Sequence, residues 1–199
     1  MTPHVFDPED RHRLDNPERR ADMPPEDTLV KAGLRPGDIV LDIGCGIGYF
    51  SVPASRMVGP KGHVYAIDIS GVMLAELRSK AASAGIFNIE TIQTQRGKLS
   101  LPDTSATMAI MSNILHEVED RKSFLESVSA ALKPEARLAV IEWEKKETPG
   151  GPPLKERISE DEMQVLLKKA GFTEPKSSRL GAAHMLYTCA RKTPAPGKE

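Results

Sequence analysis

Two acidic residues and a set of glycines near the start of the chain have a spacing that suits nucleoside binding. Asp42 lies inside an apolar run that leads directly into Gly44, Gly46 and Gly48. Glycine adopts backbone angles that other residues resist, and it lets a ligand approach the main chain. Asp68 ends a second apolar run, and a carboxylate there can accept hydrogen bonds from both ribose hydroxyls. Together these features indicate a cofactor that contains adenosine.

The glycine spacing separates two kinds of cofactor. Dinucleotide folds use Gly-x-Gly-x-x-Gly, whereas this chain has Gly44-x-Gly46-x-Gly48 preceded by Asp42. The stretch resembles the first motif of class I S-adenosylmethionine-dependent methyltransferases, in particular the branch that includes ubiquinone and menaquinone C-methyltransferases. The resemblance implies that S-adenosylmethionine is the cofactor and that Asp68 is the acid that binds its ribose.

The same resemblance assigns the other cofactor contacts. The glycine loop would hold the methionine portion, and Asp42 would lie beneath it or reach its ammonium group through water. Where the family usually has an acid that reads the adenine amino group, this chain has Gln95, so the charge at that contact is lost. The full set of expected cofactor residues is Asp42, Gly44, Cys45, Gly46, Gly48, Asp68, Ile69, Gln95, Arg96, Ser112 and Asn113.

The catalytic candidates, His116 and Glu117, follow a continuous apolar run at 107–112. Such a run is typical of a central parallel strand, and ligands in open α/β sheets bind beyond the carboxyl ends of the strands. His116 has a side-chain pKa close to neutrality and can act as a base, while Glu117 can orient it or bind a cationic substrate. The alternative is that His116 bonds only to the backbone of its loop.

Other polar residues near predicted strand ends have less definite roles. Glu142 and Trp143 are predicted equally well as pocket wall or as core packing. His184 and Tyr187, in the last predicted strand, are interpreted as structural.

The order of apolar runs and helical patterns predicts an α/β fold with a Rossmann-like, doubly wound and mostly parallel sheet. The resemblance implies seven strands in the order 3-2-1-4-5-7-6 with an antiparallel C-terminal hairpin. Pro53 is expected to remove a hydrogen bond from its helix. Strands are predicted at 39–43, 64–68, 89–94, 107–112, 137–143, 172–179 and 184–191, and helices at 26–32, 49–58, 70–85, 120–132 and 159–170.

The length of 199 residues suits one methyltransferase domain at 25–192, followed by a loose tail at 193–199. Residues 1–24 are rich in proline and charge, which predicts an irregular arm with short turns. This arm is a candidate lid over the cofactor. If it closes the site, the residues that would meet an anionic substrate are His4, His12, Arg13, Arg19 and Arg20.

Composition argues against several classes of partner. Lys and Arg number 27 against 28 Asp and Glu, a net charge of -1, so no global field attracts nucleic acid or an anionic membrane. The sequence has no long apolar run and no signal peptide pattern, which predicts a cytoplasmic protein. Cys45 and Cys189 have no metal-ligand spacing, so no metal is expected. Oligomeric state is not indicated.

The leading hypothesis is therefore an enzyme that moves a methyl group from S-adenosylmethionine to a small-molecule acceptor by in-line displacement. The segment that begins at Asn113 lacks the Asn/Asp-Pro-Pro-aromatic pattern of nucleic-acid methyltransferases. The accepting atom, whether carbon, oxygen, nitrogen or sulfur, is left open. Two alternatives are an NAD(P)-binding Rossmann oxidoreductase and a catalytically silent cofactor-binding protein.

Overall fold

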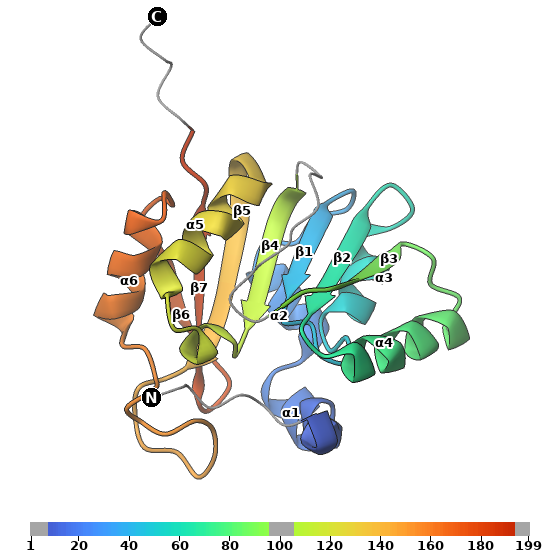
Figure 1. Ribbon diagram of the computed structural model, residues 1–199, viewed down its shortest axis with the longest axis horizontal. Coiled ribbons are helices and arrows are strands. Elements are labelled where there is room, and N and C mark those ends of the chain that lie inside the picture. The colour runs from blue at the N-terminus through green and yellow to red at the C-terminus, as the bar shows by residue number, and fades with distance from the viewer. Residues whose placement is uncertain (1–7, 96–105, 194–199) are drawn as a thin grey trace, which may run out of the picture.

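A seven-stranded sheet forms the centre of the computed structural model, which describes residues 8–95 and 106–193 (Figure 1). The strand order is β3-β2-β1-β4-β5-β7-β6, as the resemblance implied. β7 is antiparallel to both β5 and β6, while the other neighbours are parallel. The strands are β1 (Ile39–Ile43), β2 (His63–Asp68), β3 (Ile89–Gln93), β4 (Ala106–Ser112), β5 (Leu132–Trp143), β6 (Lys176–Leu180) and β7 (His184–Ala190).

Helices cover both faces of the sheet, and Figure 1 shows α5 on the near side with α2 and α3 behind. In β1, alternate residues point to opposite faces, so Val40 packs with the α2 and α3 residues and Leu41 packs with those of α5 and α6. The α-helices are α1 (Pro17–Asp22), α2 (Pro25–Lys31), α3 (Ser51–Val58), α4 (Gly71–Ser83), α5 (Arg121–Ala131) and α6 (Glu160–Lys169). Two short 3-10 helices are η1 (Pro8–Leu14) and η2 (Leu115–Glu117).

The prediction of an irregular N-terminal arm was wrong, because most of its described part is helical. The Asn16 side chain accepts a hydrogen bond of 2.8 Å from the Arg19 amide and caps α1. Pro17 occupies the first position of that helix, where its missing N–H costs nothing. A cap followed by proline therefore starts a helix in a segment whose proline content predicted turns.

Two prolines affect where elements begin. Pro53 lies in the first turn of α3 and leaves a gap in the hydrogen-bond pattern, as expected, because the Val52 amide donates to the Gly48 carbonyl at 3.1 Å and the Ala54 amide donates to the Phe50 carbonyl at 2.9 Å. α5 ends at Ala131, close to the predicted end at 132, but β5 begins at Leu132 and includes Pro134, whereas the strand was predicted to start at 137. The pairing of β4 with β5 shifts register between Ala106 and Met108, which accommodates this irregular start.

The last strands are shorter than predicted. β6 spans Lys176–Leu180, and Phe172 makes only an isolated antiparallel bridge with Arg191. The capped helices agree well with prediction, since Ser70, Asp120 and Ser159 each accept a hydrogen bond from the amide three residues on. Side-chain caps therefore located three helix starts, whereas strand ends depended on tertiary pairing.

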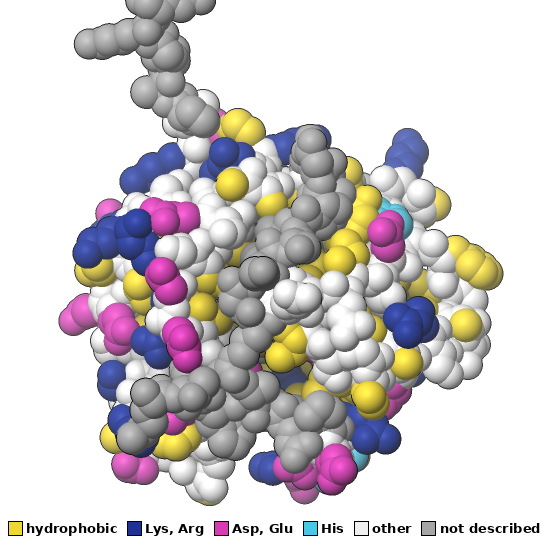
Figure 2. All heavy atoms as spheres, in the orientation of Figure 1, with side chains coloured by type: hydrophobic (Ala, Val, Ile, Leu, Met, Phe, Trp, Pro, Cys, Tyr) yellow, Lys and Arg dark blue, Asp and Glu magenta, His cyan; other side chains and the backbone are white. Residues whose placement is uncertain are grey.

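The described surface carries charges of both signs. In Figure 2, basic and acidic side chains are interleaved over α5 and α6. Lys122 and Glu126, for example, pair one helical turn apart at 2.6 Å. Across residues 8–95 and 106–193, no helix has the length and apolar character needed to cross a membrane.

The packing predicts a large difference between two phenylalanines. Phe172 is fully buried in the cluster formed with α5 and α6, whereas Phe87 is 91% exposed. Truncating a buried phenylalanine to alanine costs about 3–5 kcal/mol, while a surface substitution usually stays within about 0.5 kcal/mol. Urea unfolding should show a loss in this range for Phe172→Ala and almost none for Phe87→Ala. Equal losses would contradict this account of the core.

Candidate functional site

A cavity of about 1060 Å³ lies beyond the carboxyl ends of the parallel strands. β1, β2, β4 and β5 all run in the same direction, so the loops that follow them meet at one edge of the sheet. The loop after β1 and the end of β2 form one part of the wall, and η2 and the loop after β5 form another. Of the predicted cofactor residues, those that line the cavity are Asp42, Gly44, Cys45, Gly46, Asp68, Ile69, Gln95, Ser112 and Asn113.

Gly44 and Gly46 have conformations and surroundings that require glycine. Their φ angles are 74° and 54°, in the left-handed region. A Cβ on Gly44 would lie 2.3 Å from the Ile114 side chain, and one on Gly46 would lie 3.1 Å from Leu14. The Gly44 amide donates a hydrogen bond of 2.7 Å to the Ile67 carbonyl of β2. The loop thus lies between β2 and the segment after β4, and at these two positions no side chain covers its backbone.

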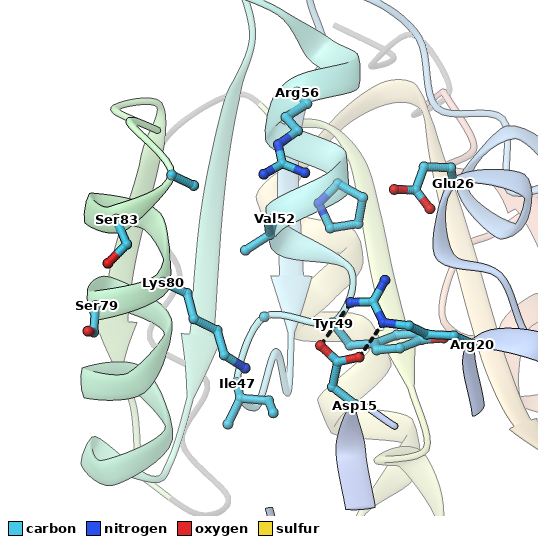
Figure 3. Close-up of a pocket in the computed structure, with 13 residues that line it drawn as sticks. Asp15, Arg20, Glu26, Ile47, Tyr49, Val52, Arg56, Ser79, Lys80 and Ser83 are labelled. Carbon is cyan, nitrogen blue, oxygen red and sulfur yellow. Dashed lines mark hydrogen bonds and ion pairs between the residues drawn. The ribbon is translucent and has the colours of Figure 1, made fainter. Parts of the chain in front are cut away.

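Gly48 has a different role from the one predicted. It does not line the cavity, and a Cβ there would lie 2.3 Å from Leu77 of α4, so its small size permits helix packing. Gly48 instead borders a second hollow of about 460 Å³, shown in Figure 3, into which Arg56 and Lys80 point. Lys80 pairs with Glu76 at 3.0 Å. Arg96 lies outside the described residues.

Two buried carboxylates face the cavity at the glycine loop. Asp68 accepts hydrogen bonds of 2.8 Å from the amides of Gly46 and Ser70, but burial dominates and raises its pKa. Burial also raises the pKa of Asp42 to about 7, against the effect of the hydrogen bond donated by Ser51. Within the described chain, neither carboxylate is part of an ion pair with a lysine or arginine. This arrangement favours a ligand that brings positive charge and hydroxyl donors.

The described part of the N-terminal arm lies against this cavity. The Arg19 guanidinium lies 4.2 Å from the centre of the Tyr49 ring and donates a hydrogen bond of 2.8 Å to the Leu14 carbonyl. The Tyr49 hydroxyl in turn donates to the Met23 carbonyl at 2.7 Å. The arm is also tied to the loop before β7, because the Ala182 amide donates to Asp22 at 2.8 Å. These contacts fix the arm beside the glycine loop.

The basic residues expected on a lid are divided between different places. Arg13 and Arg19 line the large cavity. Arg20 instead borders the second hollow and pairs with Asp15 at 2.6 Å (Figure 3). His12 is exposed and lines neither space. His4 lies outside the described residues.

His116 and Glu117 line the part of the cavity formed by η2, as predicted from their position after β4. His116 is 5% exposed, and its Nδ1 lies 2.8 Å from Oε2 of Glu142, at the end of β5. Burial lowers the pKa of His116, but the hydrogen bond and charge of Glu142, together with Glu117, outweigh it and the net direction is upward. The Nε2 atom lies 3.9 Å from Oε1 of Glu117.

A second histidine also reaches the cavity. His184, at the start of β7, lies with Nε2 3.2 Å from Nδ2 of the Asn113 side chain, and the centre of its ring is 4.3 Å from that of Trp143. Burial lowers the pKa of His184 to about 4, with a further contribution from Arg19, so its imidazole is neutral at physiological pH. Asn113 has a φ of 58°, which turns the chain sharply after β4.

The loop after β5 is held by one buried arginine. Arg157 is 4% exposed, and its guanidinium donates to acceptors in residues 144–152. Its five hydrogen bonds, of 2.7–3.1 Å, reach the carbonyls of Glu144, Lys146, Gly150 and Pro152 and the hydroxyl of Thr148. A Cβ on Gly151 would lie 2.7 Å from the Trp143 ring, so the loop backbone lies directly on the indole.

For three residues of the site, the sequence did not predict the role that the structure shows. Glu142 is 2% exposed and bonded to His116, which the pattern of β5 left undecided between wall and core. His184 was interpreted as structural, but it lines the cavity. Arg157 was not singled out at all. For Glu142 the available signal is a charged residue at the end of an apolar run, because charged residues are rarely buried unless they are paired. Arg157 follows Lys155 and Glu156, so its local sequence carries no such signal.

Comparison with known proteins agrees with this geometry. A family model described as a methyltransferase domain matches residues 40–135. The ubiquinone/menaquinone biosynthesis C-methyltransferase of Vibrio vulnificus (strain YJ016) is 39% identical over 119 residues, which is 59% of this chain and 46% of that protein. The Pasteurella multocida (strain Pm70) protein of the same description is 37% identical, over 59% of this chain and 44% of its own length. The chain spans about half the length of these curated relatives.

Solved structures extend the likeness over the whole fold. A SAM-dependent methyltransferase from Aquifex aeolicus superposes with a TM-score of 0.87 at 35% identity, covering 94% of this chain and 99% of that one. The [4+2]-cyclase SpnF superposes with a TM-score of 0.68 at 20% identity, over 84% of this chain and 79% of that one, and at that identity shares only the fold. The present chain belongs to the S-adenosylmethionine-dependent methyltransferases, of the class I fold. The two curated relatives compared above are ubiquinone/menaquinone biosynthesis C-methyltransferases.

The hydrogen bonds of Arg157 predict a specific effect of Arg157→Lys. Lysine has three donors in place of five, so at least two acceptors of the 144–153 loop lose their partner, at about 1–3 kcal/mol each if they stay buried. We expect amide hydrogen exchange in this loop to become at least 10-fold faster. Arg179→Lys is the matched control, because Arg179 is exposed and makes one ion pair with Glu144. Unchanged exchange in Arg157→Lys would show that the guanidinium does not hold the loop.

Proposed function

We propose that this chain transfers the methyl group of S-adenosylmethionine to a small-molecule acceptor. The observation that carries the proposal is that the glycine loop, Asp68 and His116 all line the same cavity. The glycine loop and Asp68 lie at one part of its wall and His116 lies at another. Membership of the methyltransferase family supports the cofactor. The acceptor of the ubiquinone/menaquinone biosynthesis C-methyltransferases is not assigned to this chain, because the chain matches only about half of their length.

The residues around the glycine loop fit the chemistry of this cofactor. Asp68 lines the cavity and would accept hydrogen bonds from ribose hydroxyls, and a cationic ammonium group beside the buried Asp42 would lower the raised pKa of that carboxyl. The bare backbone of Gly44 and Gly46 leaves room for the methionine portion. Ile69 and Gln95 would border the adenine, and Ser112 and Asn113 would complete the wall at the end of β4. When bound, the cofactor supplies a methyl group activated on a sulfonium.

The chain's own contribution is then mainly alignment. Holding two reactants in line can remove roughly 7–11 kcal/mol of the barrier, provided the reacting atoms are well oriented and water is excluded. The arm and the loop held by Arg157 border the cavity and would limit access of water to it. His116 lines the cavity and would take a proton from the acceptor, and Glu117, 3.9 Å from its Nε2, would orient it or bind a positive group.

Two alternatives stay open for experiment. An oxidoreductase would bind NAD(P) at the same strand ends, although the glycine spacing argues against it. A silent cofactor-binding protein would bind S-adenosylmethionine without turnover, and the fold shared with a cyclase supports testing this directly. A nucleic-acid acceptor is not expected, since the net charge is -1.

Ligand-induced stabilisation tests the cofactor. S-adenosylhomocysteine at about 100 times its Kd should stabilise the fold by about 2.7 kcal/mol, which for this size raises Tm by roughly 5–10 °C. NADH at the same concentration should leave Tm unchanged. A rise with NADH alone would end the methyltransferase proposal in favour of the oxidoreductase.

Replacing the proposed ribose acid should weaken cofactor binding. Hydrogen bonds to a charged group contribute about 1.5–3 kcal/mol each, so Asp68→Ala should raise the Kd for S-adenosylhomocysteine by at least about 100-fold. Calorimetry below the Tm of each variant measures this, and Asp161→Ala, on the exposed start of α6, is the control. If Asp68→Ala binds as tightly as the wild type, the ribose is held elsewhere.

A further inference from the structure

Glu142 is a buried carboxylate whose side-chain hydrogen bonds, within the described part of the chain, all go to two consecutive residues. At the end of β5 its Oε1 accepts from the amides of Leu115 at 2.7 Å and His116 at 3.3 Å. Its Oε2 lies 2.8 Å from His116 Nδ1. Both residues belong to η2, so one side chain fixes the backbone of that turn and the imidazole it carries.

This bonding determines which nitrogen of His116 is available. An ionised carboxylate only accepts hydrogen bonds, so Nδ1 must carry the hydrogen and donate it to Glu142. In the neutral imidazole the lone pair then resides on Nε2. Because His116 lines the cavity, Nε2 is the nitrogen left to accept a proton there.

Acidic groups surround His116 on several sides. Glu117 lies on the same turn, Glu142 on β5 and Glu156 on the loop before α6, and all three favour the protonated ring electrostatically. The nearest cation among the described residues of α5 is Arg121, which donates to the Leu115 carbonyl and to Glu162. Arg13 and Arg19 line the same cavity from the arm, where Arg13 pairs with Asp10 and Arg19 lies over the Tyr49 ring. Around His116 itself the three carboxylates repel an acceptor that arrives as an anion, and they stabilise an imidazolium once a proton has moved.

We propose that Glu142 is a positioning residue that fixes His116 as a general base, and that the acceptor therefore enters neutral, as a hydroxyl compound or a carbon acid. This inference rests on the proposed methyltransferase function. In the reaction, the acceptor's O–H or C–H bond breaks and the proton passes to Nε2 of His116. The freed electron pair forms the new bond to the methyl carbon, while the methyl–sulfur bond breaks and its pair stays on sulfur. Thiols need this help least, because an ordinary thiol pKa of about 8.5 already leaves a few per cent of the strongly nucleophilic thiolate at pH 7.

Glu142→Gln keeps the size of the buried side chain but changes its hydrogen-bonding groups, so it tests whether Glu142 positions His116. Glutamine has one acceptor oxygen, which cannot serve both the Leu115 amide and His116 Nδ1. If that oxygen keeps the amide of Leu115, the glutamine NH₂ group faces Nδ1, so the ring must adopt the other tautomer with hydrogen on Nε2. Glu142→Asp keeps the charge and should retain part of the function. Glu144→Gln is the matched control, because that residue pairs with Lys146 and Arg179 and does not line the cavity.

The first readout needs no acceptor. In protein labelled with ¹⁵N-histidine, His116 is assigned by loss of its signal in His116→Asn. We expect the wild-type ring to be protonated at Nδ1 above its pKa, and Glu142→Gln to lower that pKa and shift the hydrogen to Nε2. Glu144→Gln should change neither. A wild-type ring protonated at Nε2, or a Glu142→Gln ring unchanged in tautomer and pKa, would overturn the proposal.

The second readout is release of S-adenosylhomocysteine with panels of neutral phenols, β-diketones and thiols as acceptors. We expect turnover with the phenols or β-diketones, and a roughly 100- to 10,000-fold loss of kcat in Glu142→Gln with KM little changed. The base form of His116 is needed, so wild-type kcat should rise with pH through its raised pKa, and this limb should move to lower pH in Glu142→Gln. Turnover of thiols alone, or an unchanged kcat, would contradict the inference.

Calorimetry with S-adenosylhomocysteine distinguishes a failure of the inference about Glu142 from a failure of the proposed methyltransferase function. Glu142→Gln should bind it with nearly wild-type affinity, since Glu142 does not line the cavity itself. If Glu142→Gln fails to fold, as judged by its Tm, the comparison of Glu142→Asp with the wild type decides the outcome through the same tautomer and pH measurements. If the wild type does not bind S-adenosylhomocysteine, the proposed function fails first, and the inference built on it fails with it.

Discussion

The close approach of Gly44 to Ile114 is the contact on which the site depends. It brings the loop after β1 against the segment after β4, and no Cβ fits between them, since one on Gly44 would lie 2.3 Å from Ile114. The loop is simultaneously bonded to the Ile67 carbonyl of β2. The ends of β1, β2 and β4 can therefore pack together only because residue 44 has no side chain. The residues proposed to bind the cofactor and those proposed to act on the acceptor share a cavity because of this packing.

The charges in that cavity are distributed unevenly. At the glycine loop, Asp42 and Asp68 are buried with raised pKa values and no ion pair within the described chain. At η2, Glu117 and Glu142 lie close to His116 and raise its pKa. Among the described cations of the arm, Arg19 contacts the Leu14 carbonyl and the Tyr49 ring. Others pair with carboxylates: Arg11 with Glu76, Arg13 with Asp10 and Arg20 with Asp15. A cavity with this balance suits a cationic cofactor and a neutral acceptor.

The elements that enclose the cavity are held by polar contacts to the backbone. Arg157 uses five hydrogen bonds to shape the loop after β5, and Asp22 ties the arm to the loop before β7. Such segments can differ between relatives without disturbing the sheet, because loops tolerate change better than the elements they connect.

Local patterns in the sequence determined the sheet, the glycine loop and the capped helices. The run from Ile39 to Gly48 and the acid at Asp68 predicted the cofactor edge, since the carboxyl ends of parallel strands must meet there. Local sequence patterns gave wrong predictions where contacts between distant segments determine the structure. Gly48 fits the motif by spacing but packs against Leu77, and the arm is helical although it is rich in proline. Glu142 and His116 are 26 residues apart, and only the parallel pairing of β4 with β5 brings them within 2.8 Å. Sequence alone therefore located the strand ends, whereas the tertiary structure decided which side chains meet beyond them, because that depends on register and packing between distant segments.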